Sequence, residues 1–191
     1  MARLRTFIAV DVGKAIRDRL VALQDTLARA GTEVKWVEEN NLHVTLLFLG
    51  EVEDRETPAL CQAVADCCAG RDAFSISVET VGCFPNPRRP RVVWAGIGAG
   101  SAELIALHDA LEPPLLDLGC YRREDRAYTP HITLGRVRGE RSPTAALATA
   151  LARQAKWQGG ETNVREIHVL SSELTPQGPI YTVLSRAKLR T

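Results

Sequence analysis

The alternation of apolar and polar residues along the chain predicts short strands and amphipathic helices that follow one another. Apolar, β-branched runs predict strands over 4–12, 34–37, 42–49, 74–81, 91–97, a segment ending in 131–137, 164–171 and 180–184. Apolar residues at helical spacing predict helices over 14–30, 57–69, 101–118 and from 142 towards Gly159-Gly160. We expect Pro113-Pro114 to kink or break the third helix.

This order of elements is a β-α start, three β-β-α units and a closing hairpin. The pairs Thr57-Pro58 and Ser142-Pro143 each mark a helix start shortly after a strand that carries a histidine. The repetition predicts a duplicated α+β fold with approximate two-fold symmetry. Because no Gly/Ser-rich linker interrupts the sequence, we expect one domain over residues 1–191.

The same short pattern, a histidine and a threonine separated by one aliphatic residue, occurs in two of the predicted strands. The copies are His43-Val44-Thr45-Leu46 and His131-Ile132-Thr133-Leu134. Side chains at i and i+2 of a strand point to the same face, so each copy presents an imidazole and a hydroxyl together. Two such strands facing one cleft would supply two acid/base groups and two neutral hydrogen-bond donors.

These four side chains suit the in-line displacement of a phosphodiester without a metal. One histidine can accept a proton while the other donates one, on opposite sides of phosphorus. Threonine hydroxyls can donate to the non-bridging oxygens, where charge must be stabilised. One copy of so short a pattern would be more typical of ordinary core or rim histidines, but two copies in matching contexts favour a catalytic pair.

Net charge limits how the chain can bind nucleic acid. The 191 residues carry 24 basic and 23 acidic side chains, a net charge of +1, whereas a protein that coats a long duplex is usually more basic. Binding to nucleic acid would therefore be local, as at a strand end. The cluster Arg88, Arg89 and Arg91, in a proline-rich loop, is either a phosphate-contacting lip or a solvated turn.

Other compositional features argue against secretion, a disulfide framework and a structural metal. The five cysteines are odd in number and lack paired Cys-x-x-Cys spacing. The apolar stretch at the N-terminus is too short for a signal sequence, and no run of about 18 apolar residues occurs elsewhere. We expect a cytoplasmic protein with no cofactor and no membrane partner, and we expect a monomer.

The two motifs and their flanks resemble the paired signatures of the 2H (two-histidine) phosphoesterases. Within that superfamily the chain resembles the bacterial and archaeal RNA 2′,3′-cyclic phosphodiesterases, formerly called 2′-5′ RNA ligases. The resemblance extends over nearly the whole length, through residues 5–9, Trp36, 41–50, 84–91, 129–136, 171–174, Gly178 and Tyr181. It implies a bilobal fold of two antiparallel-rich sheets with helices packed outside and the active site in the cleft between the lobes.

The resemblance also implies an activity and residue roles. It implies metal-independent hydrolysis of an RNA terminal 2′,3′-cyclic phosphate to a 2′-phosphate. In that reaction His43 is the proton donor to the leaving 3′ oxygen, His131 is the proton acceptor that activates water, and Thr45 and Thr133 hold the phosphate. This assignment of acid and base comes from the family alone, because the two motifs are nearly symmetric.

Two further substrate contacts are implied five residues after each histidine. Phe48 would stack on the terminal base, and Arg136 would pair with phosphate. Strict strand alternation places both on the opposite face from the histidine. A bulge at Gly135 would re-aim Arg136, whereas Phe48 is equally consistent with a core position.

The remaining histidines and the choice of substrate leave alternatives open. We expect His108 to be an edge residue of the third helix, while His168 reaches either the cleft or the solvent face. Substrates open to the same chemistry are 3′ ends of RNA, tRNA fragments included, and small cyclic nucleotides, ADP-ribose cyclic phosphate or a 2′-5′ linkage. Ligation of RNA through a 2′-5′ bond is a side activity that the resemblance implies. The alternative from another class is a non-catalytic binder of RNA ends.

Overall fold

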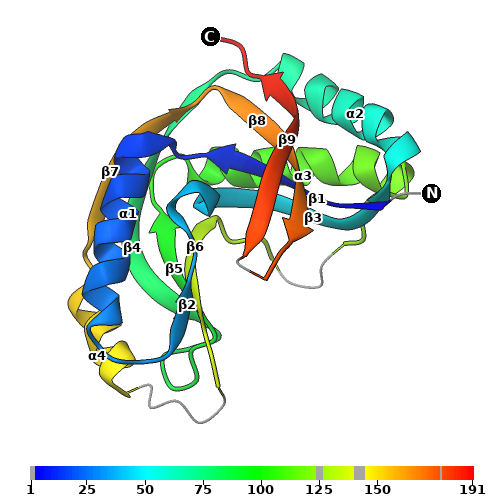
Figure 1. Cartoon of the computed structure of the whole chain (residues 1–191). Helices are drawn as coiled ribbons and strands as arrows, with labels where there is room; N and C mark the ends of the chain where they lie inside the picture. Colours follow the sequence, from blue (N-terminus) through cyan, green and yellow to red (C-terminus); the bar gives the residue numbers. More distant parts are fainter. Residues whose placement is uncertain (1–2, 124–126, 140–144, 177) are drawn as a thin grey trace.

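In the computed structural model, a strongly curved antiparallel sheet forms two lobes, and helices pack against the outside of each (Figure 1). The structure describes residues 3–123, 127–139, 145–176 and 178–191. Its strands are β1 (Arg3–Asp11), β2 (Val34–Trp36), β3 (His43–Glu53), β4 (Phe74–Phe84), β5 (Val92–Ile97), β6 (His131–Val137), β7 (Gln158–Val164), β8 (Glu166–Leu174) and β9 (Pro179–Lys188). Its α-helices are α1 (Gly13–Ala28), α2 (Thr57–Ala69), α3 (Ser101–Asp117) and α4 (Ala145–Arg153), and the 3₁₀ turns are η1 (Glu39–Asn41) and η2 (Asp54–Glu56).

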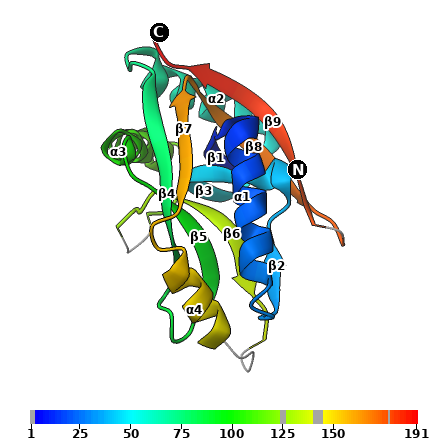
Figure 2. The ribbon, with the colours of Figure 1, turned by 90° about the vertical axis from the view of Figure 1, so that its left-hand side faces the viewer.

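The predicted α+β class and two-lobed arrangement are confirmed. The strand order is β7-β4-β5-β6-β3-β1-β8-β9, and β2 pairs with β6 at the side of this path. We call β2 and β4 to β7, with α1 and α4, the first lobe. We call β1, β3, β8 and β9, with α2 and α3, the second lobe. Figure 2 shows α1 and α4 on the outside of the first lobe.

The two half-sheets join edge to edge at the histidine motifs. Within the described residues, β3 and β6 share a single ladder pair, Val44 with Ile132, and both side chains are fully buried. Both lobes bury leucine, isoleucine and valine side chains in one continuous core. Because this burial is the main stabilising contribution, the core fixes the two motif strands on either side of the junction.

The third helix differs from the sequence-based expectation. Pro113 and Pro114 do not break α3, which continues to Asp117. Both prolines lie close to its end, where buried Leu111 and Leu115 hold the last turns against the core. The predicted helix start at 142–143 lies outside the described residues, and α4 is described from Ala145.

The segment expected to end the fourth helix is instead a strand. Gly159 and Gly160 lie in β7, which pairs antiparallel with β4. A Cβ atom at Gly159 would lie 3.0 Å from the carbonyl oxygen of Val78 and 2.5 Å from the Trp157 ring. The glycine therefore allows two strands to approach closely. The third predicted β-β-α unit is likewise only β6 followed by α4, and three strands close the chain.

Candidate active site

The junction between β3 and β6 brings the two motifs onto one face of the sheet. Val44 and Ile132 are opposite each other and point into the core, so the residues on either side of each point the other way. In this register His43 is opposite Thr133, and Thr45 is opposite His131. The two histidines thus occupy one diagonal of a four-residue cluster, and the two threonines occupy the other.

A groove follows this cluster across both lobes. It consists of two adjoining pockets of about 520 and 450 Å³. His131 lines the larger pocket and His43 the smaller, while both pockets share Thr45 and Thr133. The threonines therefore lie between the two imidazoles, where a tetrahedral group bound in the groove would meet all four side chains.

Both imidazole rings are oriented by the same backbone contact. The Nδ1–H of His43 donates to the carbonyl oxygen of Asn41 at 2.8 Å. The Nδ1–H of His131 donates to the carbonyl oxygen of Thr129 at 2.7 Å. In each motif the acceptor is two residues before the histidine, so Nε2 is the ring nitrogen available for proton transfer. Thr45 donates its hydroxyl to Nε2 of His43 at 2.9 Å.

Aromatic rings surround His43 on the second-lobe side of the groove. Phe7 stacks on the imidazole with ring centroids 5.1 Å apart, and Tyr181 meets it edge to face at 5.6 Å. Burial in this setting lowers the pKa of His43 to about 4, with the nearby positive charge of His131 acting in the same direction. The hydrogen bond that the ring donates to the Asn41 carbonyl and the carboxylate of Asp11 oppose this shift.

A β-bulge in each motif places the fifth residue after the histidine on the histidine's own face. In β3, Ala9 pairs with Thr45 but Ile8 pairs with Leu47, so Leu46 is an extra residue. The shift turns Phe48 towards the groove, where its side chain is 55% exposed and lines both pockets. A core position for Phe48 is therefore wrong.

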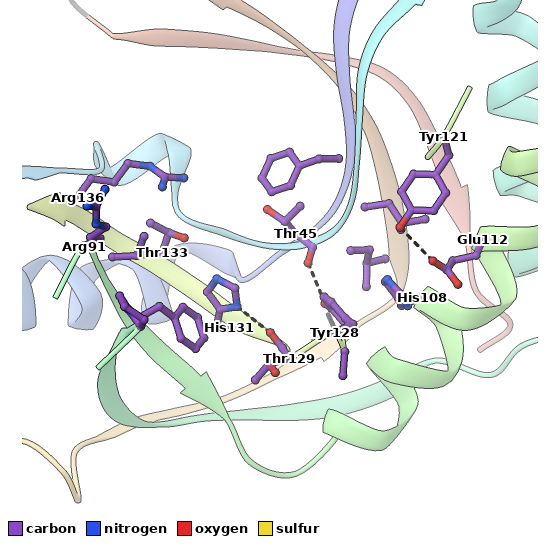
Figure 3. A pocket seen from close by; sticks show the side chains of 17 residues that line it. Thr45, Arg91, His108, Glu112, Tyr121, Tyr128, Thr129, His131, Thr133 and Arg136 are labelled. Atoms are coloured by element: carbon purple, nitrogen blue, oxygen red, sulfur yellow. Dashed lines mark hydrogen bonds between the residues drawn. The ribbon is translucent and has the colours of Figure 1, made fainter. Parts of the chain in front are cut away.

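The second motif repeats the bulge at the equivalent position. In the pairing of β6 with β5, Trp94 is opposite Thr133 and Val93 is opposite Gly135, so Leu134 is the extra residue. Arg136 consequently lines both pockets beside Thr133 (Figure 3). Gly135 is needed for a different reason, because a Cβ atom there would lie 2.6 Å from the Val34 side chain of β2.

The structure also separates residues that the sequence left undecided. His168 lines neither pocket and instead contacts Glu166 at 2.6 Å. Of the basic cluster, Arg91 lines the larger pocket, whereas Arg88 and Arg89 are exposed and line neither. His108 is not a simple edge residue, since it lines the larger pocket and stacks on Tyr128.

Several groove residues were not identified from the sequence. Tyr181, Phe7, Tyr128 and the backbone of Asn41 all contact a motif residue. They come from different elements and show no shared spacing, so the signal in the sequence was the family resemblance, which extends through residues 5–9 and 41–50 and includes Tyr181. Among the described residues, no three His, Cys, Asp or Glu side chains gather as a metal-binding group. No helix in the described segments has the length and apolar character needed to cross a membrane.

Comparison with known proteins places this groove in context. Residues 14–176 match the model of a family described as the 2′-5′ RNA ligase superfamily. A protein of Methanothermobacter thermautotrophicus named RNA 2′,3′-cyclic phosphodiesterase is 39% identical over 180 residues, which cover 94% of this chain and 96% of that protein. A protein of the same name from Thermotoga maritima is 33% identical over 181 residues, covering 95% and 93%.

Solved structures show the same fold. The crystal structure of TT0787 of Thermus thermophilus has a TM-score of 0.80 and 30% identity, covering 97% of this chain and 98% of that one. The crystal structure of E. coli LigT complexed with 3′-AMP has a TM-score of 0.79 and 26% identity, covering all of both chains.

Proposed function

Because the chain belongs to the 2′-5′ RNA ligase superfamily, we propose that it hydrolyses the terminal 2′,3′-cyclic phosphate of RNA to a 2′-phosphate, as a cytoplasmic enzyme that needs no metal. The names of its relatives support the reaction. The observation that carries the proposal is the pairing of Val44 with Ile132, because it puts two histidines and two threonines on one face of one groove.

In the proposed reaction His131 is the base and His43 is the acid. Nε2 of His131 takes a proton from water as the water oxygen bonds to phosphorus. The bond between phosphorus and the 3′ oxygen breaks, and Nε2–H of His43 protonates that oxygen. The product keeps its phosphate on the 2′ oxygen. In each turnover His131 gains one proton and His43 loses one. Passage of a proton from His131 back to His43 then restores the starting state.

The low pKa of His43 gives the substrate a part in this step. The ring is neutral in the empty groove and accepts a hydrogen bond from Thr45. An anionic phosphate beside Nε2 favours the imidazolium form, which is the form that can act as an acid. Once Nε2 carries the proton, the Thr45 hydroxyl can donate to a non-bridging oxygen, as Thr133 does from the other strand.

Arg136 and Phe48 extend the site beyond the phosphorus. Arg136 carries a fixed positive charge on the rim of both pockets and pairs with a phosphate oxygen. Phe48 offers an exposed ring on which the terminal base stacks. Both contacts read features common to any RNA end, so base identity is not selected by them.

An oligonucleotide ending in a 2′,3′-cyclic phosphate tests the proposal directly. We expect a 2′-monoester product and full activity in EDTA. His43→Ala and His131→Ala should each lower the rate by about 10²–10⁴-fold, the usual contribution of general acid–base catalysis. His168→Ala is the matched control and should keep wild-type turnover, because that ring lies outside the groove.

Three results would contradict the proposal. Binding without any product would indicate a non-catalytic binder of RNA ends. A 3′-monoester product would show that the 2′ oxygen, and not the 3′ oxygen, is the leaving group. Unchanged turnover in either motif variant would remove that histidine from the mechanism.

A further inference from the structure

Tyr128 makes a hydrogen bond between the two motifs that the proposed reaction does not itself require. The residue lies three positions before His131, in the segment that leads into β6. Its hydroxyl donates to the carbonyl oxygen of Thr45 in β3 at 2.8 Å, as Figure 3 shows. The bond therefore joins the approach to one motif with the backbone of the other.

This bond lies where the lobes have little other backbone pairing. The ladder between β3 and β6 contains one residue pair within the described residues, and Thr45 is the next residue after Val44 in that pair. On this side of the pair β6 begins at His131, so only β3 continues as a strand beyond Thr45. The tyrosine hydroxyl adds a second cross-link at the first position where the ladder no longer fixes the spacing.

Each end of the cross-link is adjacent to a group that orients a histidine. Thr129, which follows Tyr128, supplies the carbonyl that accepts the Nδ1–H of His131 at 2.7 Å. Thr45, whose carbonyl accepts from Tyr128, donates its own hydroxyl to Nε2 of His43 at 2.9 Å. A shift at either end would thus move one imidazole relative to the other.

We propose that Tyr128 is a positioning residue that sets the spacing and orientation of the two histidines through its bond to Thr45. As a role in catalysis, this rests on the proposed function. The ring is held in place by His108 of α3, which stacks on it with centroids 4.3 Å apart and planes inclined by only 2°. Burial raises the pKa of the Tyr128 hydroxyl, so the group keeps the proton that it donates.

Replacement of the hydroxyl without loss of the ring tests the proposal. Tyr128→Phe should lower kcat by about 10–100-fold, because displacements of about 1 Å in a reacting group cost up to 10²-fold. KM should change less than about 3-fold, since the phosphate contacts of Thr133 and Arg136 remain. The side-chain nitrogen resonances of His131 and His43 should shift in NMR spectra, while those of His168 stay unchanged.

Ser75→Ala is the control, because it also removes a hydroxyl that joins two segments of the fold. Ser75 of β4 lines neither pocket of the groove, and its hydroxyl donates to Asn163 Oδ1 of β7 at 2.7 Å. Its loss should leave kcat and the histidine resonances at wild-type values. Equal losses in both variants, or wild-type kcat in Tyr128→Phe, would overturn the proposal.

Two unnatural residues at this position distinguish loss of the hydrogen bond from a general effect on folding. At position 128, 4-aminophenylalanine can donate to the Thr45 carbonyl and should restore most of kcat, whereas 4-fluorophenylalanine cannot donate and should not. Equal activity of these two proteins would contradict the positioning role. Because the NMR shifts need no turnover, they test the cross-link even if the wild-type protein were to leave a cyclic phosphate unhydrolysed, which would refute the proposed function alone.

Discussion

Burial of the His43 ring lowers its pKa, whereas its hydrogen bond to the Asn41 carbonyl and the nearby Asp11 carboxylate raise it. We expect the balance of these effects to set the pH dependence of the enzyme. The net effect lowers the pKa of His43 to about 4, and Asp11 lies on the neighbouring strand. The rate constant kcat/KM depends on the protonation state of the free enzyme. The pair is active when it holds one proton, so kcat/KM falls at low pH once both rings are protonated, and this limb follows the lower of the two pKa values even when the group with that pKa is the acid. We therefore expect a bell-shaped profile of kcat/KM whose acidic limb lies near pH 4.

Asp11→Asn tests the origin of that limb. Without the carboxylate the imidazolium loses a stabilising partner, so the pKa of His43 falls further and the acidic limb moves to lower pH. Asp18→Asn is the control, because Asp18 forms an exposed ion pair with Lys14 and should leave the limb in place. A limb that moves to higher pH in Asp11→Asn would contradict this account.

At this scale the sequence predicted the four motif side chains and the face that they share. Strand alternation is enough to place His43 with Thr45 and His131 with Thr133. It does not predict Tyr128, because a hydrogen bond to a backbone carbonyl in another lobe leaves no mark in local spacing. The acid and base roles of the two histidines stay a prediction, since the motifs are nearly equivalent by geometry as well.

At the scale of elements, the two bulges explain why simple alternation fails for the fifth residue of each motif. Leu46 and Leu134 are each the third residue after the histidine, and both are fully or almost fully buried. Each adds one residue to its strand, which reverses the direction of the side chains that follow. Apolar leucines give no sign of a bulge in the sequence, so Phe48 and Arg136 could be placed only by the strand register.

The bulge in β6 is held by α1, and this predicts a measurable stability effect. Gln24 is buried, and its Nε2 donates to the carbonyl oxygens of Val37 and Leu134, both at 2.8 Å. Gln24→Met keeps the size of the side chain but removes both donors. We expect the free energy of unfolding, measured with urea, to fall by about 1–3 kcal/mol, the cost of leaving buried acceptors without this donor.

The control for this substitution is Gln62→Met in α2. The Gln62 side chain donates to Asp66 on the exposed face of its own helix. Removing that bond should change the free energy of unfolding by less than about 0.5 kcal/mol. Equal effects of the two substitutions would show that the buried link from α1 to the bulge contributes nothing specific.

For the molecule as a whole, the order of elements in the sequence predicted a duplicated fold but not how its halves interleave. The chain crosses between the lobes repeatedly: α1 follows β1 of the second lobe yet packs on β7 of the first. Local periodicity carries no information on which lobe a helix covers. The fold class followed from the repeated units, whereas the single-pair junction required the strand register.

The distribution of charge over the whole molecule differs from that of the groove. The chain has a net charge of +1, yet its two pockets are lined by four basic side chains and two acidic ones: Arg5, Lys35, Arg91, Arg136, Glu38 and Glu112. Such a local positive groove attracts the few phosphates at an RNA end rather than a long strand. The dependence of activity on salt should reveal this.

We expect kcat/KM for an oligonucleotide with a cyclic end to fall with salt, with a log–log slope between about −1 and −3, since each phosphate contact to a single strand contributes about −0.7. For a cyclic mononucleotide, which offers one phosphate, the slope should be no steeper than about −0.7. Arg5→Gln should make the slope for the oligonucleotide shallower by about 0.7, the contribution of one phosphate contact, because Arg5 lines the groove together with Phe7. Arg3→Gln, on the same strand but paired with Glu53 outside both pockets, should not change it. Identical slopes for the two substrates would mean that the groove contacts no phosphate other than the one that reacts.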